Sequence, residues 1–187
     1  MSRTLRIVAA GLLAVLAPVL AWMALGPGEN PLKNAQVGQW IEYVTHTSAM
    51  GHDMEMKLRQ SVVAKDATSV TMRTETTMMG RKMPPQDVKI ALDKAYEPYA
   101  TGLKGVTVTP LGEGNETLTV GGKPYACHWV KVKIVATEPP MTGTTKVWTS
   151  PAVPAGGVVK METDSTVSAG GQTMSTKMTM EMTGFGG

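Results

Sequence analysis

The chain has one cysteine, Cys127, and one phenylalanine, Phe185, among its 187 residues. A single cysteine cannot close an internal disulfide, so no covalent framework stabilises the fold. Isoleucine and leucine are also scarce beyond residue 26, whereas thirteen of the fifteen methionines lie there. Methionine is flexible and polarizable, and it fills irregular space well. We therefore expect a core of adaptable shape.

Motifs for catalysis and cofactor binding are missing too. The sequence has no Gly-x-Ser-x-Gly elbow, no His-Glu-x-x-His, no phosphate-binding glycine loop and no Cys-x-x-Cys pair. Cys127 and His128 are adjacent, so on a strand they point to opposite faces and cannot form a nucleophile–base pair. Tyr125 and Trp129 share the parity of Cys127, which favours a small buried thiol. The sequence therefore predicts a non-enzymatic protein without a cofactor.

A strong charge of one sign is absent from the main part of the chain. Beyond residue 26 there are sixteen basic and fifteen acidic residues, a net charge of +1. The basic residues alternate with acidic residues and threonine, as on a solvated surface, and form no basic stripe. This pattern predicts no nucleic-acid partner.

The first 26 residues have the layout of a secretory signal. Arg3 and Arg6 precede an apolar stretch from Ile7 to Leu20, and small residues follow. This order favours cleavage after Ala21. The alternative is an uncleaved anchor of about 20 residues, barely enough to cross a bilayer, through which any membrane contact would run. Either way, we expect an exported protein, periplasmic or extracellular.

Three segments of the chain are therefore predicted. Residues 1–26 form a signal peptide or N-terminal anchor, residues 27–38 a spacer containing proline and glycine, and residues 39–187 a single β-rich domain. The sequence leaves the oligomeric state open.

Alternation of apolar and polar residues with period two dominates the domain, and this is the pattern of strands with one wet face. Gly-Gly pairs and prolines separate the runs and indicate hairpin turns. We expect eight or nine strands in an antiparallel up-and-down sheet that curls into a barrel or half-barrel. A short helical or irregular insertion is expected around residues 85–103. The alternating runs are Trp40 to Thr47, Met54 to Arg59, Val70 to Thr76, Glu116 to Val120, Pro124 to Val135, Thr144 to Thr149, Val158 to Val167 and Thr173 to Thr183.

Several short motifs carry a family resemblance. Between Leu118 and Lys160 lie Val-Gly-Gly-Lys-x-Tyr-x-Cys, Lys-Val-Trp-x-Ser and Val-Pro-x-Gly-Gly-Val-Val-Lys, and Met-Thr-Gly-Phe-Gly closes the chain. With these motifs the chain resembles an uncharacterised family of exported bacterial proteins, abundant in planctomycetes, which implies no known activity. Its layout is also similar, more loosely, to the half-barrels of periplasmic lipoprotein carriers. That second resemblance is architectural and implies a curved sheet with a hydrophobic concave face.

The methionines on alternating positions suggest a ligand-binding face, because a flexible lining suits apolar ligands of varied shape. The leading hypothesis is a binding or carrier module for an apolar ligand such as a lipid. The competing interpretation is that the same side chains simply fill a closed core. The candidate face consists of Met54, Met56, Met72, Met178, Met180 and Met182.

Two further hypotheses stay open. Met50, His52, Met54 and Met56 share one parity, and thioethers with an imidazole suit a soft ion such as Cu(I), so a periplasmic copper-binding protein is one alternative. Gly51 and Asp53 indicate that this stretch begins in a turn, which would spoil part of the alignment. The other alternative is a structural envelope protein with no small ligand.

Overall fold

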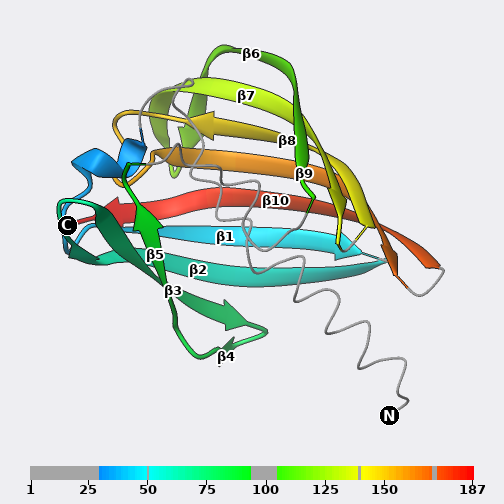
Figure 1. Cartoon of the computed structure of the whole chain (residues 1–187), viewed down its shortest axis with the longest axis horizontal. Helices are drawn as coiled ribbons and strands as arrows, with labels where there is room; N and C mark the ends of the chain where they lie inside the picture. The colour runs from blue at the N-terminus through cyan, green and yellow to red at the C-terminus, as the bar shows by residue number, and fades with distance from the viewer. Residues whose placement is uncertain (1–29, 50, 94–104, 139, 170–171) are drawn as a thin grey trace.

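The computed structural model describes residues 30–49, 51–93, 105–138, 140–169 and 172–187. Within them lie a short 3-10 helix, η1 (Pro31–Asn34), and ten strands in one antiparallel sheet (Figure 1). The expected mainly-β antiparallel fold is confirmed. The strands are β1 (Trp40–Ala49), β2 (His52–Lys65), β3 (Ser69–Met78), β4 (Arg81–Lys82), β5 (Gln86–Ala91), β6 (Thr107–Val120), β7 (Lys123–Thr137), β8 (Pro140–Thr149), β9 (Val158–Ala169) and β10 (Gln172–Gly186).

The strand order is β4-β3-β2-β1-β10-β9-β8-β7-β6, and β5 pairs with β3. The first long strand therefore pairs with the last near the middle of the sheet, and this pairing joins two meanders. Between β5 and β6 the chain crosses from one edge of the sheet to the other, so the topology is not a single up-and-down meander. The sheet curls without closing, with β6 arching at one edge and β4 at the other (Figure 1).

The expected insertion around residues 85–103 differs in part from the structure. Residues 86–91 form β5, which pairs with β3 from Ser69↔Ala91 to Thr74↔Gln86. The alternation of Val88 and Ile90 therefore belongs to a strand and not to a helix. Residues 94–103 of that prediction lie outside the described residues, as does the leader. The count reaches ten strands because the sequence analysis did not place β4 and β5.

The start of the domain packs against its body. Leu32 in η1 and Ala35 after it are buried, although both belong to the segment predicted as a spacer. The side chain of Asn30 caps η1 by accepting a hydrogen bond from the Leu32 amide (3.0 Å), and it donates to the Ala91 carbonyl (2.8 Å). No helix in the part of the chain that the structure describes is long and apolar enough to cross a bilayer.

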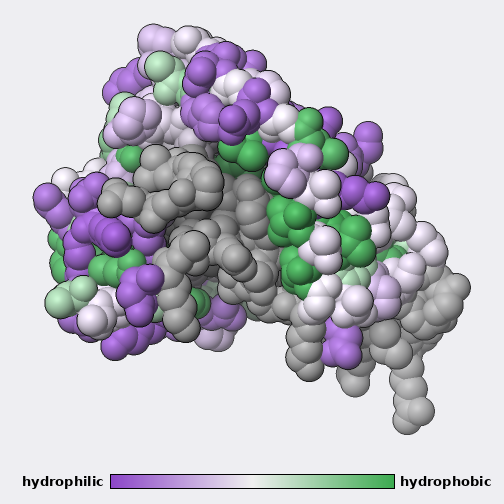
Figure 2. All heavy atoms as spheres, turned by 45° about the horizontal axis from the view of Figure 1, so that its top comes forward, coloured by the Kyte–Doolittle hydropathy of each residue, from purple (hydrophilic) through white to green (hydrophobic). Residues whose placement is uncertain are grey.

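The sheet has two chemically different faces. We call the face that carries the buried core the inner face and the opposite one the outer face. Charged side chains on the outer face form ion pairs such as Arg59–Glu42 (2.7 Å) and Lys160–Glu181 (3.1 Å). The buried apolar side chains come from β1, β2, β3 and β7 to β10, so the curled sheet wraps around them. Figure 2 shows one larger cluster of apolar side chains right of centre and smaller apolar spots elsewhere, among hydrophilic and near-neutral side chains.

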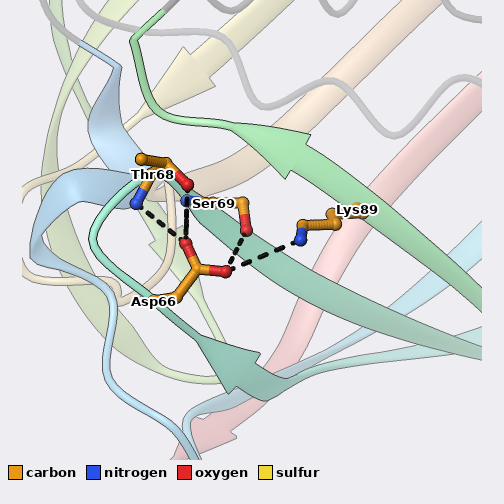
Figure 3. Close-up of polar contacts among 4 residues, drawn as sticks. All are labelled: Asp66, Thr68, Ser69 and Lys89. Carbon is orange, nitrogen blue, oxygen red and sulfur yellow. Dashed lines mark hydrogen bonds and ion pairs between the residues drawn. The ribbon is translucent and has the colours of Figure 1, made fainter.

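Asp66 fixes the turn between β2 and β3 (Figure 3). Its carboxylate accepts hydrogen bonds from the Thr68 amide (2.8 Å), the Ser69 amide (2.7 Å) and the Ser69 hydroxyl (2.7 Å). The Nζ atom of Lys89 on β5 lies 3.6 Å from the same carboxylate. The hydrogen bonds from Ser69 and Thr68 hold the pKa of Asp66 well below its usual range. This turn thus links the register of the β2–β3 hairpin to the added strand β5.

Candidate ligand-binding site on the inner face

The six methionines predicted as a ligand-binding face all lie on the inner face. Met56, Met72, Met178, Met180 and Met182 are buried, and Met54 is half-buried. Strand alternation explains this placement, because positions two apart share a face. The register shifts at Glu42/Tyr43 and Val62/Ala64 fall beyond the paired segments that hold these methionines. The structure adds Met161 of β9, which is fully buried and which the sequence analysis did not single out. Its signal was the alternation of the run from Val158 to Val167.

Cross-strand pairing brings these side chains into two rows. In the first row Met56 is opposite Thr45, which is opposite Met180, which is opposite Met161. In the second row Met54 is opposite Thr47, which is opposite Met178. Directly opposed residues in a sheet have Cβ atoms about 5 Å apart, so these side chains contact one another. Met72 lies outside both rows, because its partner on β2 is Val62.

The central part of the lining, made of segments from seven strands, is free of charge. Its inner positions hold no aspartate, glutamate, lysine or arginine, whereas the outer positions of the same strands hold many. At the margins of the lining Arg81 of β4 is paired with Met78, and Glu113 of β6 is paired with Val130. Methionine, threonine and aliphatic residues make up most of the central part. The segments that share this property are 41–49 of β1, 52–62 of β2, 72–78 of β3, 130–136 of β7, 141–147 of β8, 161–167 of β9 and 174–182 of β10.

A line of hydroxyl groups runs through the lining along β1. Tyr43, Thr45 and Thr47 follow one another on the inner face, and all three are buried. We call these three residues the β1 hydroxyl track. The Tyr43 hydroxyl donates to the Val158 carbonyl at 3.4 Å. The hydroxyls of Thr45 and Thr47 have no hydrogen-bond partner among the described residues, although less than 1 Å² of each oxygen is exposed.

Elsewhere on the inner face hydroxyl groups do find partners. Thr145 of β8 and Thr163 of β9 are directly opposite, and their hydroxyl oxygens lie 3.1 Å apart. Thr45 lacks such a partner because methionines flank it on both sides. The same holds for Thr47, between Met54 and Met178.

The residues of the alternative copper site are only partly brought together. Met50 lies outside the described residues. His52, Met54 and Met56 share the inner face of β2, but successive members are about 6.7 Å apart along a strand. Across the sheet, Met78 of β3 lies opposite Met56. Among the described residues, no three histidine, cysteine, aspartate or glutamate side chains form a group that could hold a metal ion.

Cys127 is buried, as the sequence predicts. Burial raises the pKa of its thiol, and the nearby Glu116 carboxylate adds to this effect, so the thiol stays protonated. The Cys127 Sγ–H group donates to the Tyr125 carbonyl at 3.4 Å. This environment is that of a packed apolar side chain and not of a reactive nucleophile.

Charged and aromatic residues on the outer face form a well-paired cluster. The Lys146 ammonium lies 4.3 Å from the ring centres of both Trp129 and Trp148. Glu116 accepts hydrogen bonds from the Trp148 indole and from Lys146. These two hydrogen bonds lower the pKa of Glu116. Because the charges of Lys146 and Glu116 are paired within the cluster, we interpret it as a structural cluster that stabilises the fold and not as a ligand-binding site.

A hollow of about 800 Å³ lies beside the outer positions of β1, β2 and β3. Lys57, Arg59, Glu42 and Glu75 line it, together with Met83 beyond β4. Its mixture of charges differs from the inner face, so it does not suit a bare hydrocarbon chain. The uncharged lining of the inner face is the stronger candidate for an apolar ligand.

No family model matches the chain, and no curated protein does. Several solved structures resemble it, among them the following three. An exported protein of Bacteroides fragilis with a YmcC-like fold is 12% identical, covers 82% of this chain and 97% of its own, and has a TM-score of 0.47. A lipoprotein of Parabacteroides distasonis is 11% identical, with coverages of 81% and 96% and a TM-score of 0.47. The lipoprotein YmcC of Escherichia coli is 13% identical, with coverages of 76% and 87% and a TM-score of 0.32.

The first of these proteins is described as exported, and the other two are described as lipoproteins. The sequence resemblances to planctomycete-type proteins and to lipoprotein-carrier half-barrels stay predictions.

Proposed function

We propose that this chain is an exported, non-enzymatic binding or carrier protein for an apolar ligand that contains an acyl chain. One observation carries the proposal: the lining of methionine, threonine and aliphatic residues spans seven strands of a curled sheet without a charged side chain. Apart from Lys65, which is paired with the buried Val70 at the end of β2, the charged residues of these strands lie on the other face. An uncharged concave lining of this width matches a long hydrocarbon chain better than a small polar ligand.

Methionine supports binding of this kind because of its mechanics. An unbranched thioether side chain changes rotamer at low cost, so it can move aside for a ligand and refill the space afterwards. Met180 and Met161 are directly opposite each other in one row, and Met56 lies in the same row on the other side of Thr45. A row of leucines or phenylalanines would hold one packing arrangement more firmly.

The open sheet supports the proposal as well. Its outermost strands are β6 on one side and β4 and β5 on the other, and β6 pairs with β7 alone among the described strands. Such a sheet can widen without breaking a closed ring of hydrogen bonds. A closed barrel would have to lose backbone pairs to do the same.

The direct test is to look for a ligand in the purified exported protein. Native mass spectrometry and solvent extraction should reveal acyl lipids at a defined stoichiometry. A fluorescent acyl probe should then bind to the delipidated protein and be displaced by the extracted lipid. An interior that carries no lipid and binds no acyl probe would refute the proposal.

Lining variants give a matched comparison. Replacing Met56 and Met180 by leucine keeps the lining apolar but removes thioether flexibility, and we expect weaker binding of long chains. Met79→Leu is the control, since Met79 is 81% exposed at the β3–β4 turn. Equal affinity of both variants for long acyl chains would show that the thioether groups of the inner methionines do not contribute to binding.

Copper binding is a second candidate, favoured by the shared face of His52, Met54 and Met56. Titration with Cu(I) against a competing chelator tests it. The site predicts that replacing Met54 and Met56 by leucine lowers the affinity. Unchanged affinity in this variant would reject the copper site without touching the lipid proposal.

A further inference from the structure

The β1 hydroxyl track lies along a strand near the middle of the sheet, and methionines of the neighbouring strands β2 and β10 flank it on either side. Met56 and Met180 flank Thr45, and Met54 and Met178 flank Thr47. Thr45 is 1% exposed and Thr47 is 2% exposed. Two buried hydroxyl groups without a partner among the described residues are thus placed between methionine side chains.

Leaving these two hydroxyls unpaired is unfavourable, because a buried donor without an acceptor loses its hydrogen bonds to water. A buried water molecule would satisfy them poorly, since it needs two to four polar partners and the opposed side chains are methionines. Methionine sulfur is only a weak acceptor. The hydroxyls therefore suit an acceptor that arrives from outside the chain.

We infer that the ligand presents an ester or amide carbonyl to Thr45 and Thr47, an inference that rests on the proposed function. The ligand class is then an acylated lipid, in contrast to a plain hydrocarbon or an ether lipid. The carbonyl oxygen accepts a hydrogen bond from a threonine hydroxyl. The hydrocarbon part lies against the methionines beside β1.

Tyr43 marks one end of this track. Its hydroxyl already donates to the Val158 carbonyl, so the unpaired donors begin at Thr45. Thr45 and Thr47 are two positions apart, which is about 6.7 Å along a strand. A single carbonyl can therefore bond with either threonine hydroxyl, and two carbonyls at this spacing can bond with both.

A matched pair of probes isolates the carbonyl. A monoacylglycerol and the corresponding alkyl glycerol ether have similar chain lengths and the same head group, but only the first has the carbonyl oxygen. We expect the wild-type protein to bind the ester about fivefold more tightly, the worth of one net neutral hydrogen bond. Displacement of a fluorescent acyl probe from the delipidated protein measures both affinities.

Three variants make the test specific. Replacing both Thr45 and Thr47 by valine should abolish the preference for the ester while binding of the ether stays unchanged. Replacing both Thr145 and Thr163 by valine is the control, because these hydroxyls bond to each other. That variant should keep the preference. Met79→Leu serves as a surface control.

The outcomes separate this inference from the function on which it rests. Equal binding of ester and ether by the wild-type protein would overturn the inference and leave an apolar-ligand protein. A preference that survives in the Thr45 and Thr47 double variant would also overturn it. Failure to bind either probe would refute the proposed function itself.

Discussion

Replacing Thr45 by valine should make the ligand-free protein more stable, although Thr45 is fully buried in the core. Its side chain is 1% exposed and its hydroxyl has no partner among the described residues. Valine has nearly the same shape and is also a good strand former, so it should fit without a cavity or a clash. The substitution removes only the unpaired polar group.

The magnitude follows from the cost of burying a hydroxyl that forms no hydrogen bond. That cost is about 1–3 kcal/mol, so Thr45→Val should raise the free energy of unfolding by about 1–2 kcal/mol. In a domain of this size each 1 kcal/mol corresponds to roughly 2–4 °C in Tm. Urea unfolding of delipidated protein, monitored by tryptophan fluorescence, gives the free energy directly.

Thr145→Val is the matched control, and its effect should have the opposite sign. Thr145 is equally buried and lies on the same face, but its hydroxyl is 3.1 Å from that of Thr163. Removing one partner leaves the other unpaired and should cost about 1 kcal/mol. If Thr45→Val destabilises the protein as much as Thr145→Val does, the Thr45 hydroxyl has a partner in the folded state, and the reasoning behind the hydroxyl track is wrong.

Three other predictions concern the fold around the site. Gly114→Ala should destabilise the protein by about 1–3 kcal/mol, because a Cβ atom there would lie 2.9 Å from the Trp129 ring; unchanged urea unfolding would contradict this packing. Asp66 should contribute stability that is present above its ordinary pKa of 3.8 and is lost as the pH falls below it, since hydrogen bonds depress its folded-state pKa. Thermal unfolding of Asp66→Asn should therefore depend less on pH in that window than unfolding of the wild-type protein, and parallel profiles would argue against the depressed pKa. Cys127 should resist iodoacetamide at pH 8 in the folded protein and react after unfolding in urea, because it is buried and its thiol pKa is raised; rapid labelling of folded protein, followed by mass spectrometry, would contradict both.

Local alternation predicted the faces of the strands well. The parity of Met54 and Met56, and of Met178 to Met182, placed these side chains on one face before any pairing was known. The turn at Gly121 and Gly122 was also predictable, and both residues have the positive φ angles that a type I′ hairpin turn requires. These features depend on residues close together in the chain.

Features that depend on distant pairing could not be predicted in this way. No local pattern indicates that β1 pairs with β10, some 140 residues later, yet this pairing brings Met180 beside Thr45. Residues 86–91 were ambiguous because six residues with alternating apolar positions suit a strand or a helical turn, and pairing with β3 settles the question. Met161 is the single methionine in the run from Val158 to Val167, so its place beside Met180 appears only when β9 is paired with β10.

The β1 hydroxyl track was missed for a related reason. Threonine is common in strands, and Thr45 and Thr47 look ordinary in a run that includes Tyr43 and Val44. Their hydroxyls become notable only when the register shows methionine on both flanks. A polar group without a partner is a property of the assembled sheet and not of its sequence neighbours.

The claim that the inner face holds an acyl chain is tested most directly by photo-cross-linking. An acyl ester with a diazirine along its chain would be bound to the protein and irradiated, and the labelled residues would be mapped by mass spectrometry. The account predicts labels on the side chains of Met56, Met161 and Met180, each assigned to the single residue by fragmentation. Labels confined to the outer face, around Lys57 or Trp148, would contradict it.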